Sequence, residues 1–386
     1  MSSTQLLTLL QHHHPLHKII PMINNFNYGH TSVVDYILKN YSIQESEYFI
    51  LELCIHNCMF VKQVMQYLCS HLKQNNNVET IIKLMAYCPS SIQFFKVGLY
   101  HSMSLEEMTS YVSQIVKIDC LSLYILEQVM LYAVELDHMW QENERDDVSS
   151  VSDGSQSNAS NNETVIQQKL DFLVEILLSK MKADPSEKWV ELYKKCLLPS
   201  QSHALNAIYV WYISTTGYLS NFLGLLGNEW LYGENILTRT RSVWCMTGFL
   251  IRVEMDSDFI HHAYKLMLDY LEHNIRDLVW FSTIQSAMYM FCFHSSKLFV
   301  ADTMRLINLI QNGALALASP MIVEQFCRIT EEKQLWFSRV SLKRQRRSVK
   351  EEEKSSVEML WHWFPLDPVD LPVFKSVSIY YKSFQQ

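Results

Sequence analysis

Cysteine and histidine side chains that could bind a metal ion gather in one stretch of the N-terminal third. The residues are Cys54, His56, Cys58, Cys69 and His71. Thiolates and imidazoles are zinc ligands, so a zinc site is one hypothesis. The stretch has no CxxC pair, however, and Cys54 and Cys58 share one helical stripe with Leu51 and Ile55. We therefore interpret these cysteines as core thiols and expect neither a metal nor a cofactor.

A second set of potential metal ligands is acidic. Asp146, Asp147 and Asp153 could be compared with the metal-binding aspartates of a helical enzyme such as a terpene synthase. That chemistry requires carboxylates held on a helix that faces a cavity, whereas these lie in a Ser- and Asn-rich stretch. The sequence also has no Walker A, GxGxxG, HExxH or GxSxG motif. We therefore expect no catalytic residues, and a protein that acts by binding and is not an enzyme.

The composition and the periodicity favour helices throughout. Only 9 glycines and 9 prolines occur in 386 residues, too few for the many turns of a β-sandwich or barrel. Apolar residues recur at i, i+3, i+7 and i+11 in two stretches: Leu170, Leu173, Leu177 and Met181, and Val243, Met246, Leu250 and Val253. We expect helices around residues 47–73, 78–87, 104–116, 121–139, 203–226, 258–273, 278–293, 301–317 and 320–340.

Consecutive helices joined by short polar segments are typical of antiparallel helix pairs. We therefore predict an all-α fold, an elongated HEAT-like helical-repeat solenoid. We expect five segments along the chain: N-terminal helical repeats (1–140), an acidic, Ser- and Asn-rich disordered loop (141–168), central and C-terminal helical repeats (169–340), a basic and then acidic loop (341–356), and a C-terminal strap (357–386).

The acidic loop contains two candidate phosphorylation sites. Ser150 has Asp153 three residues later and Ser160 has Glu163, an arrangement that acidophilic kinases favour. A phosphate would add about −1.5 to −2 charges at each site. The alternative is an unmodified, solvated linker.

A basic run precedes the C-terminal stretch. Its charges are Lys343, Arg344, Arg346 and Arg347, which predict a nuclear import signal, with a solvated loop as the alternative. Glu351, Glu352 and Glu353 follow closely, and the chain has a net charge of −8. We therefore expect any DNA contact to be non-specific at most.

The compartment follows from what the sequence lacks. No stretch approaches the roughly 18 consecutive apolar residues of a membrane-spanning helix. The N-terminal residues lack the basic start and apolar run of a secretory signal. The cysteines are scattered singly among apolar residues. We expect an intracellular protein without disulfides or membrane contact.

The C-terminal stretch "VEMLWHWFPLDPVDLPVF" combines aromatic residues with three prolines. Pro365 and Pro368 each favour an extended conformation in the preceding residue. A helix through Trp361 and Trp363 should therefore end at Phe364 or Leu366. Such an apolar segment could be a strap that covers the last helices, or a free binding motif.

Four stretches, taken in order, resemble the RNA polymerase I-specific transcription initiation factor family, TIF-IA. The matching residues are Arg239, Phe249, Leu250 and Arg252 in "TRTRSVWCMTGFLIRVEM", Gln285, Tyr289, Phe291, Cys292 and Phe293 in "WFSTIQSAMYMFCF", Pro320, Val323, Glu324 and Phe326 in "SPMIVEQFCRI", and Phe364, Pro365, Asp367 and Pro368 in "WFPLDP". In the first stretch, Val243 and Trp244 replace the small residues usual in the family, so we expect this helix to pack differently.

The resemblance implies a HEAT-repeat phosphoprotein of the nucleus and nucleolus. Such a factor binds RNA polymerase I subunits and recruits the enzyme to the core promoter initiation factor at ribosomal RNA genes, which serves ribosome biogenesis. It also implies that the free factor forms a homodimer. The alternative is a HEAT-repeat scaffold or adaptor for nuclear transport or another nuclear assembly, which would have the same composition.

Overall fold

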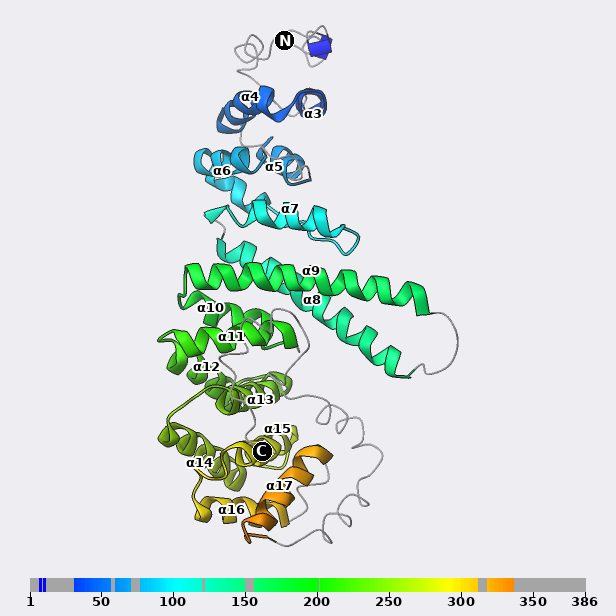
Figure 1. Cartoon of the computed structure of the whole chain (residues 1–386). Coiled ribbons are helices and arrows are strands. Elements are labelled where there is room, and N and C mark those ends of the chain that lie inside the picture. The colour runs from blue at the N-terminus through cyan, green and yellow to red at the C-terminus, as the bar shows by residue number, and fades with distance from the viewer. Residues whose placement is uncertain are drawn as a thin grey trace. The chain divides into compact units, whose positions relative to one another are not determined.

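The computed structural model describes residues 7–8, 10–11, 31–56, 60–70, 77–119, 122–149, 156–200, 202–311 and 318–336. Within these ranges the chain forms helices and connecting turns and no strand, so the prediction of an all-α fold is confirmed. The helices group into two compact units, Met1–Tyr132 and Ala133–Gln386 (Figure 1). We call them the N-terminal and the C-terminal unit.

The N-terminal unit is built from short helices. They are α3 (Thr31–Asn40), α4 (Ile43–His56), α5 (Val61–Ser70), α6 (Asn77–Tyr87), the 3₁₀ helix η4 (Pro89–Phe94) and α7 (Leu105–Ile115). A capping box starts α7: the Ser104 side chain accepts a hydrogen bond from the Glu107 N–H, and the Glu107 side chain accepts one from the Ser104 N–H. Across the α4–α6 seam, the Glu47 carboxylate accepts hydrogen bonds from Thr80 and Lys83.

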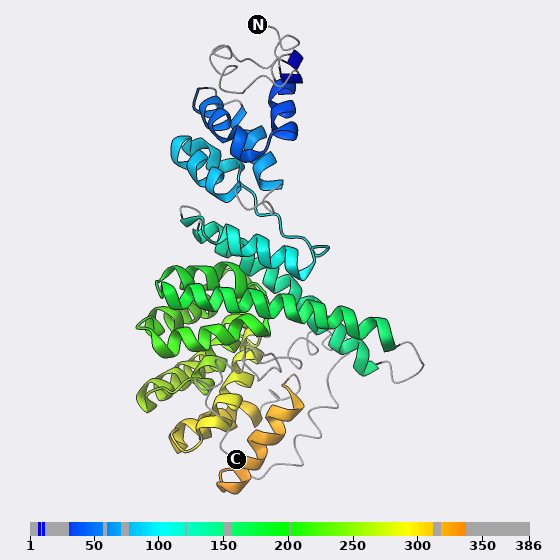
Figure 2. The same ribbon diagram turned by 45° about the horizontal axis from the view of Figure 1, so that its top comes forward.

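The boundary between the units falls inside α8 (Ser122–Ser149), after Tyr132. The C-terminal unit continues with α9 (Gln156–Ala183), α10 (Lys188–Leu192), the π-helical turn η6 (Tyr193–Leu197), α11 (His203–Thr215), α12 (Leu219–Tyr232), α13 (Ile236–Arg252), α14 (Ser257–His273), α15 (Leu278–His294), α16 (Val300–Gln311) and α17 (Pro320–Glu332). Figures 1 and 2 both show these helices following one another in packed layers.

Polar caps set where several of these helices begin. Asn235, Asp256 and Asp277 each accept a hydrogen bond from a backbone N–H in the first turn of α13, α14 and α15. Ser202 does the same for α11. These side chains satisfy N–H groups that have no partner within the helix. The turns between consecutive helices can therefore be short.

The core of the C-terminal unit contains a cluster of aromatic rings. The ring of Tyr193 in η6 packs edge-on against Tyr209, Phe222 and Phe249, with ring centroids 4.7–6.2 Å apart. The Tyr193 hydroxyl donates to the Asn206 side chain at 3.0 Å, and the Tyr209 hydroxyl donates to the Trp189 carbonyl at 2.8 Å. The cluster therefore joins η6 to α11, α12 and α13 while its polar atoms keep hydrogen-bond partners.

The periodic apolar positions face the core as predicted. Leu170, Leu173, Leu177 and Met181 on α9 are all fully buried, and Val243, Met246, Leu250 and Val253 are at most 5% exposed. Val243 and Trp244 are fully buried, and no hydrogen bond is described for the Trp244 indole nitrogen.

Several segments differ from the sequence-based expectation. The expected single helix over residues 47–73 is wrong, because α4 ends at His56 and α5 begins at Val61. The expected helix over residues 320–340 is too long, because α17 ends at Glu332. The predicted single helix over residues 203–226 is wrong, because Thr216 has an extended backbone and separates α11 from α12. The segment 141–168 was expected to be a loop, whereas α8 extends to Ser149 and α9 begins at Gln156. Helix propagation adds one hydrogen bond per residue, and Gln and Glu side chains lose little freedom in a helix, so polar residues can extend an existing helix.

Candidate functional site

Three of the stretches that carry the family resemblance form adjacent helices. They correspond to α13, α15 and α17, and α15 packs against both of the others. Figure 1 shows this block in the lower part of the C-terminal unit. Residues separated by about 80 positions in the sequence therefore build one structural core, and their polar members bridge between its helices.

Arg239 joins three consecutive helices. Its Nε donates to the Trp230 carbonyl on α12 at 2.9 Å, and a terminal nitrogen donates to the Tyr270 hydroxyl on α14 at 3.1 Å. The Trp230 indole N–H in turn donates to the Thr283 hydroxyl on α15 at 3.1 Å. A guanidinium with several donors in one plane is suited to such bridging.

Gln285 links α15 to α17. Its side-chain oxygen accepts a hydrogen bond of 2.7 Å from the backbone N–H of Ser319, the residue that precedes α17. Gln285 is 1% exposed and Ser319 8%. Pro320 follows in the first turn of α17, where its missing N–H costs nothing. The motif residues Gln285 and Pro320 thus fix the start of α17 against α15.

Arg252 packs against the aromatic side of α15. Its guanidinium lies over the Phe293 ring, 5.0 Å from the ring centroid, and Phe293 meets Tyr289 edge-on at 5.1 Å. Arg252 is only 7% exposed, so this cation–π contact is largely shielded from water.

The remaining motif residues in the described part of the chain are mostly core. Phe249, Leu250, Phe291 and Phe326 are at most 1% exposed, and the rings of Phe291 and Phe326 are 5.2 Å apart. Burial raises the pKa of the Cys292 thiol, which keeps it neutral. Glu324 is exposed on α17. The buried motif residues therefore form the core between α13, α15 and α17, and Glu324 lies on the outer surface of α17.

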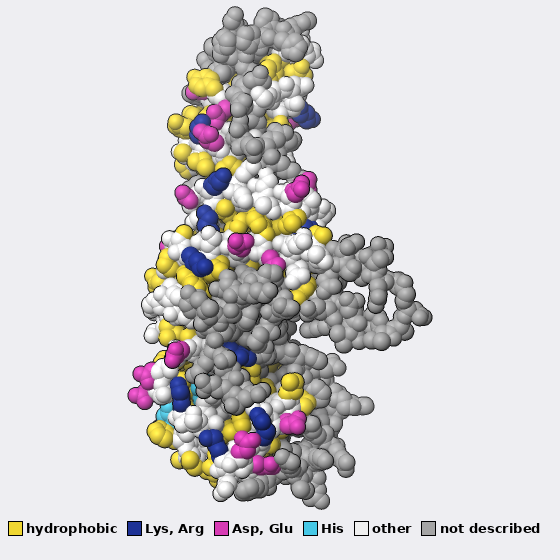
Figure 3. Space-filling view, in the orientation of Figure 1, with side chains coloured by type: hydrophobic (Ala, Val, Ile, Leu, Met, Phe, Trp, Pro, Cys, Tyr) yellow, Lys and Arg dark blue, Asp and Glu magenta, His cyan; other side chains and the backbone are white. Residues whose placement is uncertain are grey.

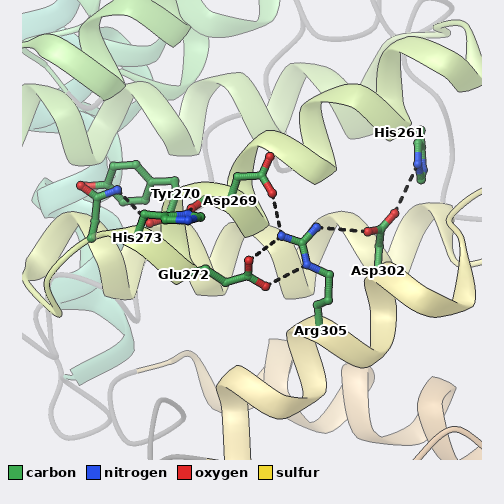
Figure 4. A network of polar contacts seen from close by, with 8 residues as sticks. His261, Asp269, Tyr270, Glu272, His273, Asp302 and Arg305 are labelled. Carbon is green, nitrogen blue, oxygen red and sulfur yellow. Dashed lines mark hydrogen bonds and ion pairs between the residues drawn. The ribbon is translucent and has the colours of Figure 1, made fainter.

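A charged network that the sequence analysis did not identify lies between α14 and α16 (Figure 4). Arg305 on α16 contacts three carboxylates. It donates to both oxygens of Glu272 at 2.8 and 2.7 Å, to Asp269 at 2.6 Å and to Asp302 at 3.3 Å. The surrounding carboxylates raise the pKa of Arg305, and its hydrogen bonds lower the pKa of Glu272.

His261 extends this network at one end. Its Nε2 lies 3.3 Å from the second oxygen of Asp302, and its ring packs edge-on against Phe299 with centroids 4.0 Å apart. Phe299 is 63% exposed. The network is therefore partly accessible at the surface, with three carboxylates around one guanidinium and an exposed aromatic ring beside them.

The metal hypothesis concerns residues that the structure describes only in part. Cys54 is 1% exposed, and burial together with the neighbouring Cys88 raises the pKa of its thiol to about 12. Cys69 is half-buried. Cys58, His71 and the side chain of His56 lie outside the described residues. Within the described ranges, no three His, Cys, Asp or Glu residues are grouped as metal ligands.

The surface in Figure 3 carries hydrophobic side chains among charged ones of both signs. On this face, the described Lys and Arg side chains are scattered and form no continuous basic patch. No helix in the described part of the chain is both long and apolar enough to cross a membrane.

Several predicted site residues cannot be placed in this arrangement. Ser160 lies within α9, and the structure describes only its backbone. The following residues lie outside the described ranges: Ser150, Lys343, Arg344, Arg346, Arg347, Phe364, Pro365, Asp367 and Pro368.

Comparisons with known proteins agree with the resemblance. A family model described as "RNA polymerase I specific transcription initiation factor RRN3" matches residues 124–386. A search of curated proteins found no sequence match. Among solved structures, the chain is similar to one titled "Crystal Structure of RNA Polymerase I Transcription Initiation Factor Rrn3", with a TM-score of 0.70 and 15% identity. The alignment covers 95% of this chain and 89% of that chain. The prediction of a helical-repeat solenoid is thereby confirmed.

Proposed function

Because the chain belongs to the family of RNA polymerase I specific transcription initiation factors, RRN3, we propose that it binds RNA polymerase I and recruits it to the core promoter factor at ribosomal RNA genes. The observation that carries this proposal is the family match, which covers most of the chain and all of α9 to α17. The helical-repeat fold supports it, because stacked helix pairs offer long surfaces for binding large partners. The factor would be non-catalytic and would act in the nucleus and nucleolus.

Sequence features whose side chains the structure does not describe supply the proposed regulation and localisation. Phosphate on Ser150 or Ser160 would add negative charge and change the affinity for the polymerase. The basic run from Lys343 to Arg347 would serve nuclear import, with DNA contact at most non-specific. A homodimer of the free factor remains part of the proposal.

The test is affinity purification of the tagged full-length protein from nuclear extract, before and after phosphatase treatment, with mass spectrometry of the bound proteins. Recovery of RNA polymerase I subunits and of the core promoter factor, in amounts that the phosphatase changes, would support the proposal. Recovery of nuclear transport factors without polymerase I would instead support a helical-repeat adaptor.

A variant can also recover less RNA polymerase I because it is less stable, so a surface variant is compared with a variant of the core. Glu324→Lys reverses an exposed charge on the surface of α17, and Gln285→Met disturbs the buried link beneath it. If α17 forms part of the polymerase surface, Glu324→Lys should reduce recovery several-fold without changing thermal stability. Gln285→Met should lower both.

A further inference from the structure

We propose that an exposed apolar face at the start of α16 binds a basic amphipathic helix of a partner protein. The α16 face, as we call it, consists of Phe299, Val300, Ala301 and Met304. Phe299 is 63% exposed, Val300 61% and Met304 39%, although most large apolar side chains of the described chain are buried. Exposed apolar residues that adjoin one another mark interaction sites, whereas scattered ones do not. The proposal goes beyond polymerase recruitment and does not depend on it.

The way α16 packs leaves this face uncovered. On one side of the helix, Asp302 lies 3.3 Å from His261 and Arg305 donates to Asp269 at 2.6 Å, both on α14 (Figure 4). The residues of α16 that are buried in the core are Thr303, Leu306, Ile307 and Ile310. Val300 and Met304 are four residues apart and share the remaining side, which borders the core away from α14.

The shape of the α16 face suits a helix as its partner. Val300 and Met304 belong to one row of side chains spaced four residues apart, and such a ridge fits into the groove between the ridges of a second helix. An amphipathic helix carries a complementary apolar stripe at the same spacing. Docking such a helix would remove the exposed side chains of the α16 face from water. The face is small, so charge must add to the affinity.

The charges of this region favour a basic partner. Residues 254–336, which contain α14 to α17, carry ten acidic and six basic side chains, a net charge of −4 with histidines neutral. The whole chain of 386 residues has a net charge of −8, so the region holds half of the surplus negative charge. An acidic helix would be repelled by this surplus, whereas a basic helix would be attracted to it.

Part of the negative charge lies directly beside the α16 face. The His261 ring packs on Phe299 with centroids 4.0 Å apart, so the first turns of α14 and α16 are neighbours. Asp258 is exposed one turn before His261, and among the described residues no cation is paired with its carboxylate. Arg305 is already shared by three carboxylates and does not neutralise them all. A Lys or Arg of the partner would therefore pair with Asp258 while its apolar stripe covers Val300.

Fluorescence anisotropy of two labelled helical peptides with the full-length protein tests the charge of the partner. Both peptides carry the same apolar stripe of Leu residues, and the polar face is Lys-rich in one and Glu-rich in the other. We expect the Lys-rich peptide to bind at least about tenfold more tightly. Asp258→Lys should weaken its binding about threefold, because an exposed ion pair is lost. Glu234→Lys makes the same change at an exposed glutamate before α13 and should leave its affinity unchanged.

Val300→Asp tests whether the peptide docks on the α16 face. The substitution removes exposed apolar surface and adds a carboxylate. Attraction to negative charge alone would make the Lys-rich peptide bind more tightly, whereas docking on the face predicts binding at least about tenfold weaker. Ile275→Asp, at an 80% exposed apolar residue between α14 and α15, is the matched control. Circular dichroism of both variants confirms that the fold is kept.

Four outcomes would overturn the proposal. Three are the absence of saturable binding of the Lys-rich peptide, equal affinity for the two peptides, and equal effects of Val300→Asp and Ile275→Asp. The fourth concerns the basic run of this chain. If replacing Lys343, Arg344, Arg346 and Arg347 by Gln tightens binding of the Lys-rich peptide about tenfold, that run already occupies the α16 face and no partner is needed.

Discussion

The side-chain oxygen of Gln285 on α15 accepts a hydrogen bond of 2.7 Å from the backbone N–H of Ser319, directly before α17. The residue that satisfies the start of α17 therefore belongs to another helix. Both partners are buried, so water has little access to either of them if the bond is broken.

Gln285→Met should destabilise the C-terminal unit by about 1–3 kcal/mol, because it leaves the buried Ser319 N–H without an acceptor. Urea denaturation followed by circular dichroism would measure the change. Gln311→Met, at an exposed position on α16, should change the free energy of unfolding by less than about 0.5 kcal/mol. A similar small change for both variants would show that the bond contributes little.

Arg305→Met should destabilise the protein by about 1 kcal/mol at neutral pH, because three carboxylates lose their shared cation while part of the interaction is screened by water. Arg305 lowers the pKa of Glu272 in the folded state. This contribution is therefore present above the unfolded pKa of Glu, about 4.3, and is lost as the pH falls through the lower folded value. The difference between wild type and variant, measured by urea denaturation, should shrink below pH 4 and also at high salt.

Asp171→Asn should stabilise the protein. Burial, with a smaller effect of Glu175, raises the pKa of Asp171 to about 6, and no hydrogen bond is described for its buried Oδ1. Ionisation of this group in the folded state therefore costs free energy. The wild-type protein should lose stability as the pH rises from about 4 to above 6, by about 1–3 kcal/mol. Asp171→Asn should lack this loss, so thermal melts at pH 4 and pH 7.5 should differ less in the variant.

Gly224→Ala should stabilise α12 by about 0.5–1 kcal/mol, since alanine has the higher helix propensity. A Cβ at Gly224 would have no heavy atom within 4 Å. At Gly233, which follows the same helix, a Cβ would clash with the Glu229 carbonyl oxygen. Gly233→Ala should therefore destabilise the protein. Opposite shifts in melting temperature would confirm both expectations, and equal shifts would contradict them.

The sequence predicted the bounds of α14 and α15 most accurately. The expected helices at 258–273 and 278–293 differ from α14 and α15 by one residue at one end. The expected helix at 203–226 failed because its apolar residues continue across the break, and only Thr216 and Gly217 indicate a turn. Periodicity reports which face is buried, but it does not show where one helix stops and the next begins.

The sequence did not predict which side chains Arg239 and Arg305 contact. The partners of Arg239 and Arg305 lie on other helices, with Tyr270 31 positions from Arg239 and Glu272 33 positions from Arg305. The spacings of Asp269 with Glu272 and of Asp302 with Arg305 place each pair on one helical face. That signal was available, but the meeting of the two faces depends on how α14 packs on α16. The family motif identified Arg239 and Gln285 as important without indicating that they act as bridges.

The bridge made by Arg239 has a consequence for how the C-terminal unit comes apart. In a helical repeat that contacts only its neighbours, the terminal helices can fray one pair at a time. Here a single guanidinium holds α12, α13 and α14 together, and Gln285 fastens the start of α17 to α15. Opening any one of these helices breaks bonds in another, so the described helices of the unit should melt in one cooperative transition, and α17 should resist proteases as well as α13 does.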